Sequence, residues 1–210
     1  MTGAELVIKL LTEHGVESIF GYPGGAIMPI YDALYQSPVK HYLCRHEQGG
    51  AFSAIGFARA SGKTGVCMAT SGPGATNLVT GIADAIIDCT PMVAITGQVS
   101  SHLLGTDAFQ ETDVINITTP VCKWNYQVTN PDEIPEVLAK AFFIARAGKP
   151  GPVLVDITKD EQMALMTKPF TYKKIEKLAG YHPRVTPKIE QVQKAADLIN
   201  QAKRPYILFG

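Results

Sequence analysis

The sequence predicts an α/β protein in which a parallel sheet is flanked by helices on both faces. Short apolar runs suited to buried strands alternate along the chain with amphipathic segments suited to helices. Turns rich in Gly or Pro follow several of the apolar runs directly. Hydrophobic residues make up 46% of the chain and charged residues 18%, which is typical of a globular domain with a substantial core.

The expected strands are the short apolar runs at 18–20, 41–44, 66–70, 92–96, 121–128 and 153–157. The expected helices lie between or before them, at 2–14, 27–35, 47–60, 75–87 and 131–147. The first helix has the clearest limits. Thr2 and Glu5 have the spacing of a capping box, and Gly15 is suited to end the helix.

The alternation of strands and helices covers residues 1–165, which we expect to form one domain. Residues 166–187 are rich in Lys, Pro, Tyr and Gly and are interpreted as a solvated linker. Residues 188–210 are expected to hold the first helix, from Ile189, and the first strand, Pro205–Phe209, of a second α/β domain. One helix and one strand cannot bury a core, so we expect the chain to end just inside that central domain.

Composition argues against several classes of function. The formal net charge is +0, so nothing in the overall charge favours binding to nucleic acid or to acidic membranes. No run is suited to span a membrane, and the N-terminus lacks the features of a signal peptide. The four cysteines are widely spaced among apolar residues, which predicts buried, reduced thiols in a cytoplasmic protein and no metal site.

Several polar motifs come directly after predicted strands, at 21–25, 45–50, 71–74 and 97–98. Because ligands of parallel sheets bind outside the carboxyl ends of the strands, we expect these motifs to share one rim. Glu47 stands out among them, beside Gly49 and Gly50. An acid in the first turn of a helix commonly stabilises the helix dipole. A carboxylic acid in an apolar cleft would instead have a raised pKa and could exchange a proton with a bound heterocycle.

Two further stretches admit more than one interpretation. The turn Gly72–Asn77 resembles a phosphate-binding loop, but it lacks the third Gly of a dinucleotide fingerprint and the Lys of a P-loop, which favours a simple tight turn. The segment 97–112 combines amide, hydroxyl, carboxylate and aromatic side chains without periodicity. Loops of this length inside compact domains are often functional.

Taken together and in order, these motifs resemble the amino-terminal part of the acetohydroxyacid synthase (acetolactate synthase) catalytic subunit, a thiamine diphosphate enzyme. The turn around Glu47 and the Ser-Gly-Pro-Gly turn are shared by a wider superfamily, whereas the run from Gly105 to Glu111 is more specific to the synthases. The resemblance is carried by Phe20–Ala26, Arg45–Gly49, Ala69–Asn77, Ile95–Gln98 and Gly105–Glu111.

The resemblance implies the fold of the pyrimidine-binding domain and a set of site residues. The glutamate at position 47 would hydrogen-bond the aminopyrimidine ring of thiamine diphosphate and promote loss of the thiazolium proton. The backbone of Gly25 and the side chain of Gln110 would lie near the reacting atoms. The resemblance further assigns Pro73, Asn77 and Lys149 to cofactor binding, and Ala26, Phe109 and Lys159 to the substrate.

The resemblance also implies cofactors that this chain would hold only in part. The family binds Mg²⁺ and the diphosphate through a Gly-Asp-Gly motif, which the sequence lacks. It binds FAD mainly in the central domain, where Lys149 would reach it; many relatives have Arg there, and Lys lacks the bidentate fork of Arg. We therefore expect no metal ligand in this chain and no activity from it alone.

The implied partners are 2-keto acid substrates, a second catalytic chain forming a homodimer or a dimer of dimers, and a small regulatory subunit. The implied reaction decarboxylates pyruvate and condenses it with a second 2-keto acid, giving acetolactate or acetohydroxybutyrate for branched-chain amino acid biosynthesis. Alternatives are a pyruvate oxidase, a glyoxylate carboligase, a catabolic acetolactate synthase, or a non-catalytic dimerisation module.

Overall fold

The structure, a computed structural model, describes residues 1–170, 172–182 and 186–208. The chain divides into two compact units, Met1–Lys177 and Leu178–Gly210. The first unit contains a six-stranded sheet in which all pairs are parallel, with the strand order β2-β1-β3-β4-β6-β5. The predicted fold class is therefore confirmed.

The strands alternate along the chain with the helices that connect them, as expected for parallel pairing. The strands are β1 (Ser18–Gly21), β2 (Lys40–Leu43), β3 (Gly65–Ala69), β4 (Met92–Gln98), β5 (Trp124–Val128) and β6 (Pro152–Thr158). The helices of the first unit are α1 (Gly3–Glu13), α2 (Met28–Tyr35), α3 (Glu47–Ser61), α4 (Pro73–Thr76), α5 (Val79–Ile87), α6 (Val114–Thr118), α7 (Ile134–Arg146) and α8 (Lys159–Met163). Short 3₁₀ turns lie at Ser101–Leu103, Thr119–Val121 and Pro131–Glu133.

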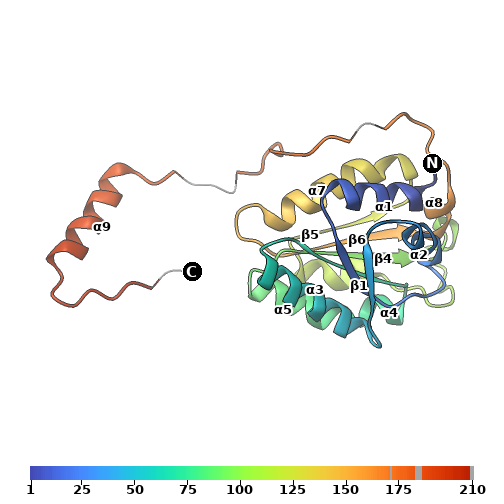
Figure 1. The fold of residues 1–210 in the computed structure, drawn as a ribbon, viewed down its shortest axis with the longest axis horizontal. Helices are drawn as coiled ribbons and strands as arrows, with labels where there is room; N and C mark the ends of the chain where they lie inside the picture. The colour runs from blue at the N-terminus through green and yellow to red at the C-terminus, as the bar shows by residue number, and fades with distance from the viewer. Residues whose placement is uncertain (171, 183–185, 209–210) are drawn as a thin grey trace. The chain divides into compact units, whose positions relative to one another are not determined.

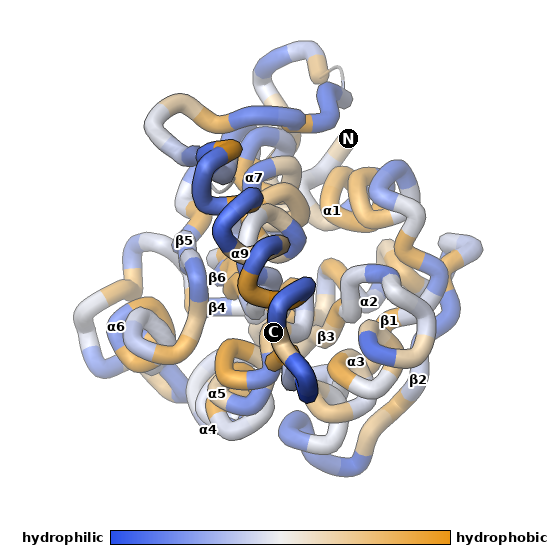
Figure 2. The backbone as a smooth tube through the Cα atoms, turned by 90° about the vertical axis from the view of Figure 1, so that its left-hand side faces the viewer, coloured by the Kyte–Doolittle hydropathy of each residue, from blue (hydrophilic) through white to orange (hydrophobic). Residues whose placement is uncertain are grey.

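Helices cover both faces of the sheet, with α1 and α7 on one side and α3 and α5 on the other (Figure 1). Successive residues of the central strands enter opposite cores, because side chains alternate along a strand. In β3, Met68 packs into the α1 and α7 core, and Cys67 into the α3 and α5 core. Figure 2 shows the strands side by side in the order β2-β1-β3-β4-β6-β5, and it also shows the apolar character of α1.

The limits of α1 and α3 follow from local sequence. Thr2 Oγ1 accepts a hydrogen bond from Glu5 N, and Glu5 Oε2 accepts one from Thr2 N, so the predicted capping box is confirmed. His46 caps α3 through Nδ1, which accepts from Gln48 N at 3.2 Å. Gly62 ends α3 with φ 70°, a conformation that favours glycine.

The structure corrects several predicted boundaries. The helix expected at 75–87 is divided into α4 and α5. The division occurs because Leu78 N donates a hydrogen bond to Ala75 O, three residues earlier, as in a 3₁₀ turn. The expected strand 121–128 begins only at Trp124, since Pro120 lies in a 3₁₀ turn just before it. Gly97 and Gln98, expected in a loop, are the last residues of β4.

The cysteine prediction was right in part. None of the four cysteines is in a disulfide, but only Cys67 is buried. Cys44, Cys89 and Cys122 lie beyond the ends of strands or helices and are half-exposed, because the apolar runs beside them pass out of the core there.

The region after the sheet domain differs from a uniform linker. Met166, Phe170 and Tyr172 pack against the first core. The second unit contains α9 (Ile189–Gln201). The strand expected at Pro205–Phe209 is absent from 205–208, where no neighbouring strand supplies hydrogen bonds, and Phe209 lies outside the described residues. The domain limits predicted near 165 and 187 remain predictions. In the described ranges, no helix is long and apolar enough to cross a membrane.

Candidate active site

The predicted motifs meet at the carboxyl edge of the sheet. The chain leaves β1 toward β2 on one side and later adds β3 on the other, so the strand order reverses between β1 and β3. Such a switch point is where parallel α/β sheets commonly bind ligands, outside the carboxyl ends of the strands. The turns that follow β1, β2 and β3 therefore surround the position where a ligand is expected.

Glu47 lies at this edge as the first residue of α3 and is half-buried. Its Oε2 accepts a hydrogen bond of 2.9 Å from Nδ2 of Asn77. A methyl group placed on Gly74 would lie 3.4 Å from the other oxygen, Oε1. Within the described part of the chain no hydrogen bond reaches Oε1. The carboxylate is thus held by one oxygen, which leaves the other able to bond to a heterocyclic nitrogen.

The glycines beside Glu47 have different roles. A methyl group on Gly50 would lie 3.4 Å from Cα of Gly21 in β1, so α3 packs closely on the sheet there, as expected. Gly49 has open space on its Cβ side. A side of α3 next to Glu47 is therefore uncovered in this chain.

Thr70, which the sequence analysis did not single out, joins two turns of the site. Its Oγ1 accepts a hydrogen bond of 3.2 Å from Ala26 N. Methyl groups on Gly24 and Gly74 would lie 2.6 and 2.7 Å from atoms of the Thr70 side chain. Glycine at both positions therefore lets the two turns close on Thr70, which is 8% exposed. Nothing lies within 4 Å on the Cβ side of Gly25, so its backbone is open to a ligand.

Gln110 reaches the same edge through its backbone. A methyl group on Gly72 would lie 2.6 Å from Gln110 O, and Gly72 has φ 54°. The turn 72–77 therefore contacts the Gln110 backbone at its first residue, Gly72, and bonds to Glu47 at its last residue, Asn77. The side chains of Gln110 and Phe109 are exposed, Phe109 to 88%. This turn connects two of the three residues that the resemblance places in catalysis, Glu47 and Gln110; the third is Gly25.

The other predicted site residues divide into two groups. Pro73 opens α4 in this turn, and Lys159 begins α8 directly after β6, at the same edge. Lys149 does not join them. It precedes β6, whose first residue Pro152 pairs with Met92 at the start of β4, so it lies at the amino edge of the sheet. A ligand that contacts Lys149 would be a different group from one that contacts Glu47.

A buried carboxylate, Asp156, lies in β6 below this edge. It accepts hydrogen bonds from Thr96 Oγ1 (2.6 Å), Gln98 Nε2 (3.2 Å) and Gln127 Nε2 (2.8 Å). Burial raises the pKa of Asp156 to about 6, although these three bonds act to lower it. An Asp inside the apolar run 152–158 was a signal available in the sequence, because a carboxylate is rarely buried without partners.

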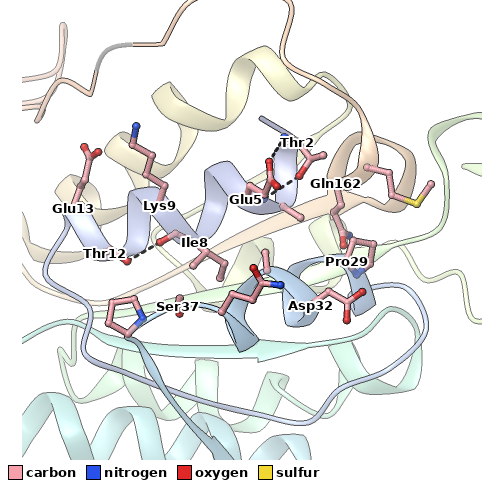
Figure 3. Close-up of a pocket in the computed structure, with 15 residues that line it drawn as sticks. Thr2, Glu5, Ile8, Lys9, Thr12, Glu13, Pro29, Asp32, Ser37 and Gln162 are labelled. Carbon is pink, nitrogen blue, oxygen red and sulfur yellow. Dashed lines mark hydrogen bonds between the residues drawn. The ribbon is translucent and has the colours of Figure 1, made fainter.

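Elsewhere in the first unit, a groove of about 800 Å³ lies between α1, α2 and α8 (Figure 3). Its walls carry Glu5, Glu13 and Asp32 with one cation, Lys9, and Gln162 lies at one end. None of the predicted site residues lines it. Over the described residues, no group of three His, Cys, Asp or Glu side chains could hold a metal ion.

Comparison with known proteins agrees with this geometry. Residues 1–117 match the family model described as thiamine pyrophosphate enzyme, N-terminal TPP binding domain. The chain belongs to this family. The match contains Glu47, Asn77, Gly25 and Gln110.

Similar curated proteins in this family are acetolactate synthase subunits. The chain is 54% identical to the acetolactate synthase large subunit of Corynebacterium glutamicum, over 100% of this chain and 33% of that protein. It is 51% identical to the acetolactate synthase isozyme 2 large subunit of Escherichia coli K12, over 100% of this chain and 37% of that protein. It is 52% identical to the probable acetolactate synthase large subunit of Methanocaldococcus jannaschii. The chain thus spans about a third of the length of these relatives.

Proposed function

We propose that this chain is the amino-terminal portion of a thiamine diphosphate-dependent acetohydroxyacid synthase. The reaction is decarboxylation of pyruvate followed by condensation with a second 2-keto acid, in the cytoplasm. The single observation that carries the proposal is the Glu47 carboxylate, held by Asn77 at the carboxyl edge of the sheet with Oε1 left to bond a ligand. The relatives support the proposal, because about half of the residues of this chain are identical to those of acetolactate synthase large subunits.

In this proposal Glu47 would hold a proton at Oε1 and bond there to a ring nitrogen of the aminopyrimidine, while Asn77 fixes the carboxylate orientation through Oε2. Thiamine diphosphate, when bound, supplies the electron sink for decarboxylation. The open backbone of Gly25 would face the bound group, and Thr70 holds that backbone through its hydrogen bond to Ala26 N. Pro73 fixes the start of the turn that ends at Asn77.

The substrate side of the site is formed by the loop after β4 and by the start of α8. Phe109 and Gln110 project from the loop into solvent and are available to contact a 2-keto acid. Lys159 adds a cation at the same edge, and Ala26 adds a small apolar wall. Mg²⁺ and FAD would be bound mainly by parts of the enzyme outside this chain, with Lys149 as a contact to FAD at the amino edge.

A second catalytic chain would complete the site. The outer face of α3 begins beside Glu47, and both Gly49 and Gly56 have open space on their Cβ sides. Phe52, on the same helix, is 40% exposed. Glycines that permit close approach beside an exposed aromatic ring suit a helix packed against another protein surface. Such a surface would also remove water from around Glu47. The three relatives above are named large subunits, which supports a further, smaller regulatory partner for this chain.

The proposal is tested by acetolactate formation from pyruvate in the complete catalytic polypeptide, with thiamine diphosphate, Mg²⁺ and FAD present. Glu47→Gln should lower the rate by about 10²–10⁴-fold, the usual contribution of a positioned proton-transfer group. The control is Glu176→Gln, an equivalent change at an exposed position. Pyruvate turnover that gives acetyl phosphate or acetaldehyde in place of acetolactate would contradict the proposed reaction.

A further inference from the structure

The loop between β4 and α6, which carries Phe109 and Gln110, has a conformation that needs outside support. Asp107 and Gln110 have φ of 57° and 58°, in the left-handed region that is unfavourable for residues other than glycine. Inside the loop, the Glu111 carboxylate accepts hydrogen bonds from the backbone N–H groups of Gly105 and Ala108. These bonds organise the tip of the loop, but they do not attach it to the sheet.

The side chain of Gln98 bonds to residues at both ends of this loop, which Asp160 also holds near its start by accepting hydrogen bonds from Ser101 N and Ser101 Oγ. Gln98 is the last residue of β4 and is 1% exposed. Its Oε1 accepts a hydrogen bond of 2.9 Å from Val99 N, at the start of the loop. Its Nε2 donates one of 2.9 Å to Thr112 O, at the end of the loop. One amide group therefore fixes the separation between the two ends.

Asp156 determines which way this amide points. The second hydrogen of Gln98 Nε2 is donated to Asp156 Oδ2, so the nitrogen faces two acceptors and the oxygen faces a donor. A reversed amide would place its oxygen against the carboxylate and a carbonyl, which is unfavourable in a buried site. Thr96 and Gln127 donate to the same carboxylate and keep it in place.

Gln127 provides a natural comparison for Gln98. Both donate to Asp156 Oδ2 through a side-chain amide, from strands on either side of β6. The described hydrogen bonds of the Gln127 side chain do not include one to the β4–α6 loop, whereas two of the Gln98 bonds are to it.

We propose that Gln98, oriented by Asp156, is a positioning residue that holds both ends of the β4–α6 loop. In this way it keeps the Gln110 backbone in contact with Gly72. The proposal rests on the proposed function for the importance of Gln110, but the clamp itself is a property of this chain. Gln98 does not touch the reacting groups. Its effect on catalysis would come entirely through the loop.

The test compares Gln98→Met with Gln127→Met, two changes that remove an amide of similar length, by amide hydrogen–deuterium exchange on this chain. Gln98→Met should speed exchange of the internally bonded amide of Glu111 by about tenfold or more, because the bond that holds the adjacent Thr112 is lost, whereas the amide of Leu103 stays protected by the Ser101–Asp160 bonds. Gln127→Met should leave them within about twofold of the unaltered chain. Amides of β3 serve as the internal reference for global opening. If Gln98→Met does not fold, Gln98→Asn keeps an amide that is too short to reach both ends.

In the complete polypeptide, Gln98→Met should lower kcat for acetolactate formation about tenfold relative to Gln127→Met, with little change in the thiamine diphosphate concentration needed. Equal loop exchange in the two variants, or unchanged exchange in Gln98→Met, would overturn the proposal. The same holds if the loop loosens while kcat is preserved. If the unaltered polypeptide forms no acetolactate, the proposed function fails, and the exchange experiment still decides whether Gln98 holds the loop.

Discussion

Ionisation of Asp156 should make this protein less stable as the pH rises from about 4 to 7. Burial raises the pKa of Asp156 from 3.8 to about 6 in the folded chain, so the folded state binds its proton more tightly than the unfolded state does. The stabilisation from this proton is complete below pH 3.8 and is lost as the pH rises through about 6. At about 1.4 kcal/mol per pKa unit, the loss amounts to about 3 kcal/mol.

The assay is urea unfolding from pH 4 to 7.5, followed by fluorescence of Trp124, the single tryptophan, which lies in β5 beside β6. Asp156→Asn is compared with the unaltered chain at every pH. Carboxylates whose pKa is lowered, such as Asp160, change stability in the opposite direction, but they are present in both chains and cancel in the difference. Asp113, which also raises the pKa of Asp156, is likewise common to both chains.

The free energy of unfolding of the unaltered chain minus that of Asp156→Asn should fall by about 2.4 kcal/mol between pH 4 and pH 7, since part of the full loss occurs below pH 4. A difference that does not depend on pH, or one that rises with pH, would refute the view that burial dominates the environment of this carboxylate. The absolute stability of the variant does not enter this comparison, because only the slope with pH is used.

Two further predictions concern the turns of the site. Gly72→Ala should destabilise the chain by about 2 kcal/mol or more, because φ is 54° and the added methyl would lie 2.6 Å from Gln110 O. Gly25→Ala should leave the free energy of chemical unfolding unchanged within about 0.5 kcal/mol, since nothing lies within 4 Å of the added methyl. The same change should weaken thiamine diphosphate binding, measured by calorimetry on the complete polypeptide. Thr70→Val should cost about 1 kcal/mol in the same unfolding assay by removing an acceptor of a buried N–H, whereas Thr70→Ser should recover part of this loss; equal costs for both would argue against the hydrogen bond.

Much of the fold could be predicted because its signals are local. Four of the six strands, β1, β3, β4 and β6, are short and largely apolar runs separated by helices, and both ends of α1 carry recognisable capping residues. The position of Glu47 after β2 was enough to place it at the carboxyl edge with the turns after β1 and β3. Periodicity does not locate the break at Leu78 or the late start of β5, because both depend on backbone turns stabilised by neighbouring elements.

The supporting residues of the site were harder to predict, since they act between distant parts of the chain. Thr70 bonds to a residue 44 positions away, and Asp156 accepts from Gln98, 58 positions away. Their partners are set by strand order, which the sequence pattern alone leaves open. Lys149 is a simpler case, because it precedes the predicted strand 153–157 and a residue before a strand of a parallel sheet lies at the amino edge.

The role of Glu47 is tested most directly by the rate at which thiamine diphosphate, bound to the complete polypeptide, exchanges its thiazolium C2 proton with deuterium, measured by rapid quench and NMR. Glu47→Gln should slow this exchange by about 10²–10⁴-fold while the exposed control Glu176→Gln exchanges at the unaltered rate. Exchange in Glu47→Gln that is as fast as in the unaltered protein, with cofactor shown to be bound, would contradict the assignment of Glu47 as the working carboxylate.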